Sequence, residues 1–201
     1  MPYRGTASEI PTDIQNLMMG KSMKEGAKIS FDELAYLKIP HYDFNGNVTE
    51  GELVVNKKLA DEVLDIFAEL FEIRYPIEKM RLVDYYNASD FDSIDDNNTS
   101  AFNYRVSTAG TGSLSKHALG CAIDINPQIN PYVASDGRGS HSNAAEYWSR
   151  DKSKWTSDTA KRAYIGSDSE IYYIFVTEHH WEWGGSWSSY LDYQHFQKSV
   201  N

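Results

Sequence analysis

A histidine and an aspartate lie seven residues apart in the stretch S-L-S-K-H-A-L-G-C-A-I-D-I-N, which runs from Ser113 to Asn126. The two residues are His117 and Asp124, with a glycine and several small or branched residues around them. Imidazole nitrogens and carboxylate oxygens are both common ligands of zinc. The stretch therefore suggests a metal site, provided that the rest of the ligand shell lies elsewhere in the chain.

A catalytic zinc site needs a third protein ligand, because such sites are four-coordinate and keep one position for water. His195 is notable among the remaining histidines because Asp192 precedes it by three residues. A hydrolytic zinc site also needs a carboxylate that does not bind the metal and that exchanges protons with water and the leaving amine. His195 and Asp192 are candidates for these two roles, although spacing alone is weak evidence.

The other histidines have simpler interpretations. His179 and His180 lie at the end of a predicted helix, where a cap or a dipole interaction accounts for them. We expect His141, in a polar region, to face water, and His41, before a turn, to hydrogen-bond locally.

Four motifs in order carry a resemblance to a known family. The pattern S-x-H-x-x-G-x-A-x-D, which starts at Ser115 and ends at Asp124, resembles the signature of the M15 peptidase family, the zinc D-alanyl-D-alanine carboxypeptidases and L,D-endopeptidases. The segments N-N-T-S-A-F-N-Y-R and I-D-I-N-P-Q-I-N-P-Y-V are also similar, as is W-G-G-S-W followed by D-Y-Q-H-F. The resemblance extends from about Gly51 to Gln197.

The resemblance implies roles for individual residues. His117, Asp124 and His195 would bind Zn²⁺, and Asp192 would be the general base, a position that is glutamate in some members.

Two further residues align with substrate-contacting positions of the family. Arg105 corresponds to an arginine that contacts the substrate and the developing oxyanion, and an arginine is equally suited to a substrate carboxylate. Ser115 corresponds to a serine near the metal ligand that touches substrate or the outer ligand shell.

Composition restricts the partners. The 201 residues carry a formal net charge of −10 with 41% hydrophobic residues. This balance supports a packed core and argues against nucleic acid or an anionic membrane surface as the main partner. The single cysteine, Cys121, allows no internal disulfide and is expected to be a small buried residue.

Targeting signals are weak. We find no apolar run of the ~18 residues that a membrane span requires, and the start of the chain lacks the apolar stretch of a secretory signal. The resemblance implies a peptidoglycan substrate and hence a location in the cell envelope or outside a bacterium, and a cytoplasmic location stays open. We expect a monomer.

Hydrophobic periodicity predicts several elements. Asn45-Gly46 between extended runs predicts a hairpin turn, and the residues from Asn56 up to Pro76 form an amphipathic helix. A strand is predicted for M-R-L-V-D-Y-Y, a solvated loop for N-A-S-D-F-D-S-I-D-D-N-N-T-S, and a buried strand for C-A-I-D-I-N.

The second half of the chain is predicted to begin with a polar surface insertion over residues 134–161. A helix follows, starting at a capping box of Ser167 and Glu170, and the aromatic segments near the C-terminus are extended. Together the elements predict an α+β fold with a mainly antiparallel sheet flanked by helices. The resemblance implies that this fold is of the hedgehog/DD-peptidase type. Residues 1–50 are predicted as an N-terminal extension and residues 51–201 as the zinc peptidase catalytic domain.

The predicted function is zinc-dependent hydrolysis of an amide bond in peptidoglycan stem peptides or muropeptides. Release of the terminal D-alanine is favoured, because N-N-T-S-A-F-N-Y-R and N-P-Y-V are closer to the carboxypeptidase branch. The alternatives are an L,D- or D,D-endopeptidase, such as a phage-lysin-like wall hydrolase, and a non-catalytic zinc-bearing binding module as in hedgehog signalling domains. Intact Asp192 and Arg105 argue against the last.

Overall fold

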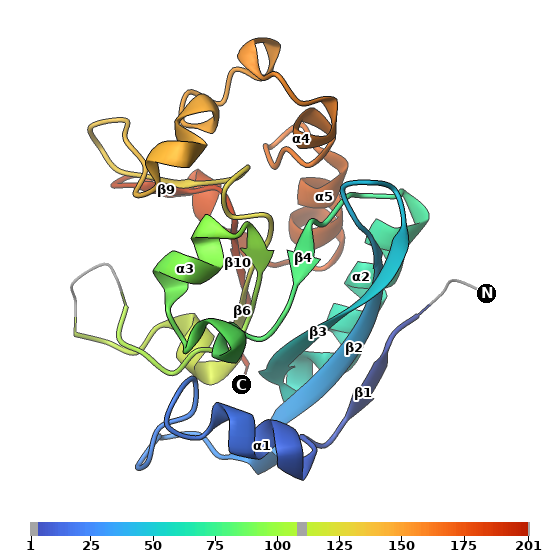
Figure 1. The fold of residues 1–201 in the computed structure, drawn as a ribbon, viewed down its shortest axis with the longest axis vertical. Coiled ribbons are helices and arrows are strands. Elements are labelled where there is room, and N and C mark those ends of the chain that lie inside the picture. The colour runs from blue at the N-terminus through green and yellow to red at the C-terminus, as the bar shows by residue number, and fades with distance from the viewer. Residues whose placement is uncertain (1–3, 108–111, 201) are drawn as a thin grey trace.

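The N-terminal half is built on a three-stranded antiparallel sheet. The computed structural model describes residues 4–107 and 112–200, and its first sheet has the order β1 (Thr6–Ser8), β2 (Leu34–Tyr42) and β3 (Val48–Asn56) (Figure 1). Strands β2 and β3 pair from Leu34↔Asn56 to Tyr42↔Val48, which confirms the predicted hairpin. Gly46 takes a positive φ of 81° in its turn, a conformation that glycine adopts without strain.

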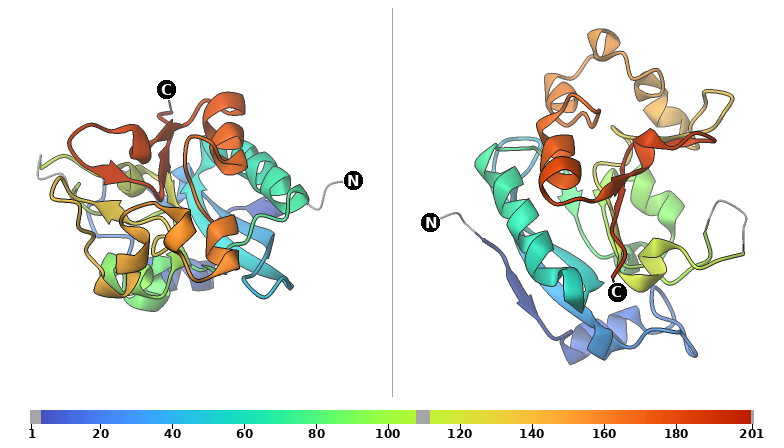
Figure 2. Two further views of the ribbon diagram at one scale, coloured as in Figure 1. Left: turned by 90° about the horizontal axis from the view of Figure 1, so that it is seen from above. Right: turned by 180° about the vertical axis from the view of Figure 1, so that it is seen from behind.

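Helix α2 (Ala60–Glu72) packs across one face of this sheet (Figure 2). It confirms the predicted amphipathic helix and is preceded by a 3-10 turn, Lys57–Leu59, whose Lys58 amide is capped by the Asn56 side chain. Its buried residues include Val63, Ile66, Phe67 and Leu70, which recur at helical spacing. They join Leu37, Leu53 and Val55 of the sheet in the main core.

The opposite face of the sheet is covered by α1 (Thr12–Met18). Met18 of this helix lies in a second buried cluster with Tyr36 and Val54 of the sheet. The first forty residues therefore include β1, α1 and most of β2. The predicted domain boundary after residue 50 lies inside β3, where Glu50 pairs with Pro40. The division into an extension and a catalytic domain stays a prediction.

A second antiparallel sheet has the order β6 (Ala122–Asp124), β10 (His195–Gln197) and β8 (Glu182–Trp183). Two small pairs accompany it, the parallel β4 (Lys79–Met80) with β5 (Asn98–Thr99) and the antiparallel β7 (Tyr132–Val133) with β9 (Leu191–Asp192). The α+β fold with mainly antiparallel pairing is confirmed, and so is the predicted strand in C-A-I-D-I-N.

One core joins both sheets. Helix α5 (Glu170–Tyr172) continues into a π-helical segment, Tyr173–Glu178, and Phe175 of that segment stacks on Phe196 of β10 with ring centroids 4.1 Å apart. Both rings are fully buried in the cluster that includes α2. The predicted helix is confirmed, but its cap is Ser169, whose hydroxyl accepts from the Tyr172 amide, rather than Ser167.

Two local predictions are wrong. The segment M-R-L-V-D-Y-Y is extended only at its start, in β4, and turns into a 3-10 segment, Val83–Tyr86. Asp84 there points inward and accepts hydrogen bonds from the Ser22 amide and hydroxyl, a contact across 62 residues. The loop that follows contains a helix, α3 (Asp90–Asp95), capped by Ser89.

The polar insertion is more ordered than expected. It contains 3-10 segments and α4 (Asp158–Arg162), at the end of the molecule away from α1. Trp155 is buried there against Ala160, Ala163 and Ile129 in a small core of its own. No helix within residues 4–107 and 112–200 has the length and apolar character needed to cross a bilayer.

Candidate metal centre

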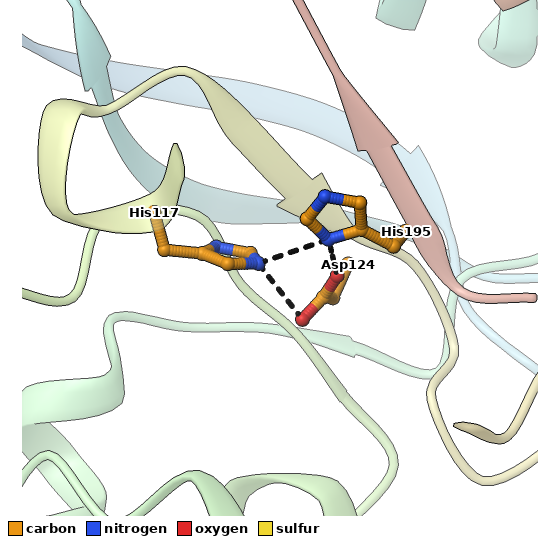
Figure 3. A group of neighbouring side chains, drawn as sticks. All are labelled: His117, Asp124 and His195. Carbon is orange, nitrogen blue, oxygen red and sulfur yellow. Dashed lines mark hydrogen bonds and ion pairs between the residues drawn. The ribbon is translucent and has the colours of Figure 1, made fainter. Parts of the chain in front are cut away.

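Three side chains from separate segments point at one another (Figure 3). The His117 Nε2 atom lies 3.2 Å from His195 Nδ1 and 3.2 Å from Asp124 Oδ2. The His195 Nδ1 atom lies 3.0 Å from Asp124 Oδ1. Across residues 4–107 and 112–200, this is the one cluster of three potential metal-ligating side chains, and both histidines in it are buried. The structure therefore brings together the three residues that the sequence predicted as ligands.

Strand register positions two of the three residues. Strands β6 and β10 are antiparallel, and their pairing places His195 directly opposite Asp124. Side chains of directly opposed residues project from the same face of a sheet and lie close together. A register shift of one residue would turn one of the two side chains to the other face.

A short turn positions His117. The 3-10 turn Lys116–Leu119 is capped by the Ser115 hydroxyl, which accepts a hydrogen bond from the His117 amide. Gly120 ends the turn with a φ of 66°, and its carbonyl accepts from the Asn56 amide at 2.8 Å. A Cβ atom at Gly120 would lie 2.4 Å from that amide nitrogen. Position 120 of the motif therefore favours glycine for two reasons: its backbone is left-handed, and it lies too close to β3 for a side chain.

The outer nitrogens of both histidines face hydrogen-bond acceptors. The Nδ1 atom of His117 lies 2.6 Å from the Ala101 carbonyl oxygen, which can only accept a hydrogen bond. The Nε2 atom of His195 lies 2.9 Å from the Gln197 side-chain oxygen. A neutral ring therefore carries its proton on the outer nitrogen, which leaves the lone pair of the inner nitrogen facing the cluster.

These donors suit a divalent metal. The two inner imidazole nitrogens lie 3.2 Å apart, and each lies 3.0–3.2 Å from a different oxygen of Asp124, an arrangement that repels unless protons or a cation lie between the atoms. Tetrahedral zinc with bonds of about 2.0–2.1 Å separates its ligand atoms by about 3.3 Å. Two imidazole nitrogens and one carboxylate at this spacing match both the ligand types and the size of such an ion.

The electrostatics of the cluster show how strongly it attracts positive charge. Burial disfavours the imidazolium of His195, but the hydrogen bond and the charge of Asp124 raise the pKa of His195 to about 9. Burial would likewise raise the pKa of Asp124, but the charges and hydrogen bonds of His117 and His195 hold that pKa well below its usual range. Metal binding would exchange these protons for a cation.

Asp192 lies beside the cluster without belonging to it. It ends β9 and lines the same cleft as both histidines, and its Oδ1 atom is buried without a hydrogen-bond partner among the described residues. Burial, followed by repulsion from Asp124, raises the pKa of Asp192 to about 6. Gly184 allows this approach, since a Cβ there would lie 2.6 Å from the Asp192 carbonyl oxygen. This arrangement can exchange a proton near neutral pH.

The remaining two candidates lie in the cleft as well. Arg105 and Ser115 line it together with His117, Asp192 and His195. The partly buried guanidinium of Arg105 forms an ion pair with Asp90 of α3, and Ser115 is buried. The structure thus brings all six predicted residues to one place.

Other histidines lie outside the cluster. The prediction that His141 faces water is wrong, because the ring is buried and contacts Phe91 of α3. Its Nε2 atom lies 2.9 Å from the Phe91 carbonyl oxygen, and its ring stacks on Phe91. His41 is buried in β2, near the Tyr42 carbonyl as expected, and the two ring nitrogens of His179 contact carboxylate oxygens of Glu62 and Glu69 of α2.

Aromatic residues divide between the core and the cleft. Trp181 and Trp183 are buried in the main core, whereas Trp187 lines the cleft. Cys121 is buried, as predicted.

Gln197 was not predicted to belong to the site. Its position two residues after His195 could have predicted this, because alternate side chains of a strand share a face.

One comparison with known proteins gives a match. Residues 109–198 match a family described as D-alanyl-D-alanine carboxypeptidase. The match spans a little under half of the chain and contains His117, Asp124, Asp192 and His195, whereas Arg105 lies before it. No curated protein and no solved structure was found to match the chain.

Proposed function

We propose that this chain is a peptidase of the M15 family, whose model its residues 109–198 match, and that it hydrolyses an amide bond in the peptide stem of bacterial peptidoglycan with zinc as its metal. The observation that carries the proposal is the triangle of His117, Asp124 and His195 with the buried Oδ1 atom of Asp192 beside it, which has no hydrogen-bond partner among residues 4–107 and 112–200. Ligands and a separate base in one cleft are what metal-assisted hydrolysis requires.

Asp192 is proposed as the general base. Zinc, when bound, supplies a Lewis acid that lowers the pKa of water towards ~7. Asp192 would accept the proton of the attacking water on its buried Oδ1 atom and return it to the leaving amine. A pKa raised to about 6 keeps the proton affinity of this carboxylate close to that needed for both transfers near neutral pH, although a nearby dication would lower this pKa.

Arg105 is proposed to stabilise negative charge in the substrate. Its ion pair with Asp90 holds the guanidinium at the cleft, and it retains further N–H donors. Such donors are suited to the carbonyl oxygen that becomes negative during attack, where the loss of one donor typically costs ~3 kcal/mol of barrier. They are equally suited to a terminal carboxylate of the substrate. Ser115 is proposed to hold the His117 turn and to touch substrate.

Release of the terminal D-alanine is the proposed reaction, in line with the description of the matching family. The test is incubation of the zinc-loaded protein with defined muropeptides, with and without a chelator, read by mass spectrometry. Loss of one alanine that the chelator abolishes is the expected result. Internal cleavage of the stem would make the protein an endopeptidase instead.

The experiment must distinguish a non-catalytic, zinc-bearing binding module from an enzyme preparation that has lost its activity. Retained zinc and muropeptide binding without any cleavage would contradict the proposed enzymatic function. The Asp192→Asn variant provides the matched control, since it keeps the size of the side chain and removes the base.

The same premise extends to the setting of the protein. We propose a hedgehog/DD-peptidase-like fold, a monomer, and action in the cell envelope or outside the cell, where the peptidoglycan substrate lies. Size-exclusion chromatography with light scattering tests whether the protein is a monomer of 22.9 kDa.

A further inference from the structure

A chain of side-chain hydrogen bonds leads from His195 to the surface. The Nε2 atom of His195 lies 2.9 Å from Gln197 Oε1, and Gln197 Nε2 donates to Glu182 Oε2 at 2.9 Å. The other oxygen of Glu182 accepts from the Trp187 indole at 2.7 Å. Strand pairing supports this chain, because Glu182 on β8 lies directly opposite Gln197 on β10.

The chain has a defined direction. A carboxylate can only accept hydrogen bonds and an indole N–H can only donate. Glu182 therefore requires the amide nitrogen of Gln197 to face it, which turns the amide oxygen of Gln197 towards His195. An oxygen at that place accepts only from a protonated Nε2 atom. The Nδ1 atom of His195 is then the nitrogen with the free lone pair, and it is the one that faces the cluster.

We propose that Gln197 and Glu182 are positioning residues that select the tautomer of His195 and hold its ring, so that Nδ1 is presented to the metal. This inference rests on the proposed metal centre. The corresponding acceptor for His117 is the backbone carbonyl of Ala101, which no substitution removes. The acceptor for His195 is a side chain, so the tautomer and orientation of the His195 ring depend on the residues at positions 197 and 182.

The chain also reaches the cleft wall. Trp187 lines the cleft, and its ring centroid lies 5.2 Å from that of His195. The Glu182 carboxylate therefore anchors both the Gln197 amide and the Trp187 indole, the two groups that flank the His195 ring. Residues in such an outer shell typically change metal affinity by about 10–100-fold.

The test is a zinc dissociation constant for a set of variants, measured by competition with a chelating dye. Gln197→Leu should weaken zinc binding by about 10–100-fold. Glu182→Ala should weaken it as well, and should add little in the Gln197→Leu background, since Glu182 acts through Gln197. Gln15→Leu is the matched control, because the Gln15 amide binds a backbone carbonyl at the distant α1. Circular dichroism and urea unfolding verify that each variant folds.

Exchanging the two side chains at positions 197 and 182 tests whether zinc affinity can be restored. The double substitution Gln197→Glu with Glu182→Gln keeps an acceptor facing His195 and a donor between the two strands. It should restore zinc affinity to within about a few-fold of the unsubstituted protein, unlike Gln197→Leu. Unchanged affinity in Gln197→Leu, or strictly additive effects of the two single substitutions, would overturn the proposal.

The tautomer itself has a spectroscopic signature. Nitrogen-15 NMR of the zinc-loaded protein should show His195 protonated at Nε2, with slow exchange of that proton, and Gln197→Leu should speed the exchange. A wild-type His195 that binds zinc through Nε2 would disprove the role of the chain while leaving the metal centre intact. Failure of the unsubstituted protein to bind zinc would instead overturn the metal centre, and the positioning role with it.

Discussion

At the scale of single residues, two neighbouring aspartates have opposite electrostatic environments. Asp124 faces two imidazoles and its pKa is held below the usual range. The buried Oδ1 atom of Asp192 has no hydrogen-bond partner in the part of the chain that the structure describes, and the pKa of Asp192 is raised to about 6. A pair of carboxylates with divergent pKa values is a recognised mark of divided roles. Under the proposed function, the division would be that of a metal ligand that stays ionised and a group that takes up and releases a proton.

Asp192→Asn should retain zinc and lose turnover. The amide has the size of the carboxylate but cannot accept the proton of the attacking water, and general bases typically contribute about 10²–10⁴-fold to rate. Metal content by atomic emission and muropeptide turnover by mass spectrometry measure the two effects separately. Substantial residual turnover would remove Asp192 as the base.

The same substitution should stabilise the metal-free protein at neutral pH. A carboxyl whose pKa rises on folding binds its proton more tightly in the native state, so stability falls as pH rises from about 4 to about 6. The asparagine variant avoids this penalty. Above pH 6 we expect the free energy of unfolding of the variant to exceed that of the unsubstituted protein by about 1–2 kcal/mol. Below pH 4 we expect no difference. Urea unfolding in the presence of a chelator at several pH values measures this, and a pH-independent difference would contradict the assignment.

At the scale of elements, the site depends on one register and one turn. The β6–β10 pairing places Asp124 opposite His195, and the turn closed by Gly120 brings His117 to them. Gly120 also packs directly on the backbone of β3, since a Cβ atom there would lie 2.9 Å from the Val55 carbonyl carbon. The N-terminal hairpin is thus the support on which the His117 turn rests.

Gly120→Ala should therefore damage both stability and metal binding. The positive φ and the clash with backbone together are expected to cost about 2–4 kcal/mol, because neither neighbour is a flexible side chain. Gly137→Ala is the control, with a similar φ of 81° and open space around it, and should cost about 1 kcal/mol. Urea unfolding measures both, and equal costs would show that the contact with β3 contributes nothing.

At the scale of the whole molecule, the ligands couple distant parts of the chain. His195 meets His117 across 78 residues and Asp124 across 71, so the unfolded chain does not hold the three together. Binding free energy at such a site contributes directly to folding free energy. The shared core of α2, β6, β10 and the segment Tyr173–Glu178 is what holds the ligand-bearing strands in place.

Zinc should accordingly raise the melting temperature. A zinc concentration of 100 times the Kd at pH 8 should add about 2.7 kcal/mol of stability at that pH, and the same concentration should add less at pH 6 because protons compete for His195. His195→Ala should abolish most of the shift, whereas His180→Ala, at an exposed residue, should leave it unchanged. Calorimetry measures the shift, and an equal response in both variants would place the zinc elsewhere.

The amino-acid sequence alone determined what is local along the chain. The N-G hairpin, helix α2 and the buried strand of C-A-I-D-I-N follow from turn chemistry and hydrophobic period, and ordered motifs predicted the three residues that form the cluster. Tertiary structure alone decided which distant groups meet. Asp84 turns inward to Ser22, His141 is buried on α3, Arg105 pairs with Asp90, and Gln197 links His195 to Glu182. The physical reason is that backbone conformation depends mainly on neighbouring residues, whereas partners for buried polar groups are set by strand register and packing between segments far apart in sequence.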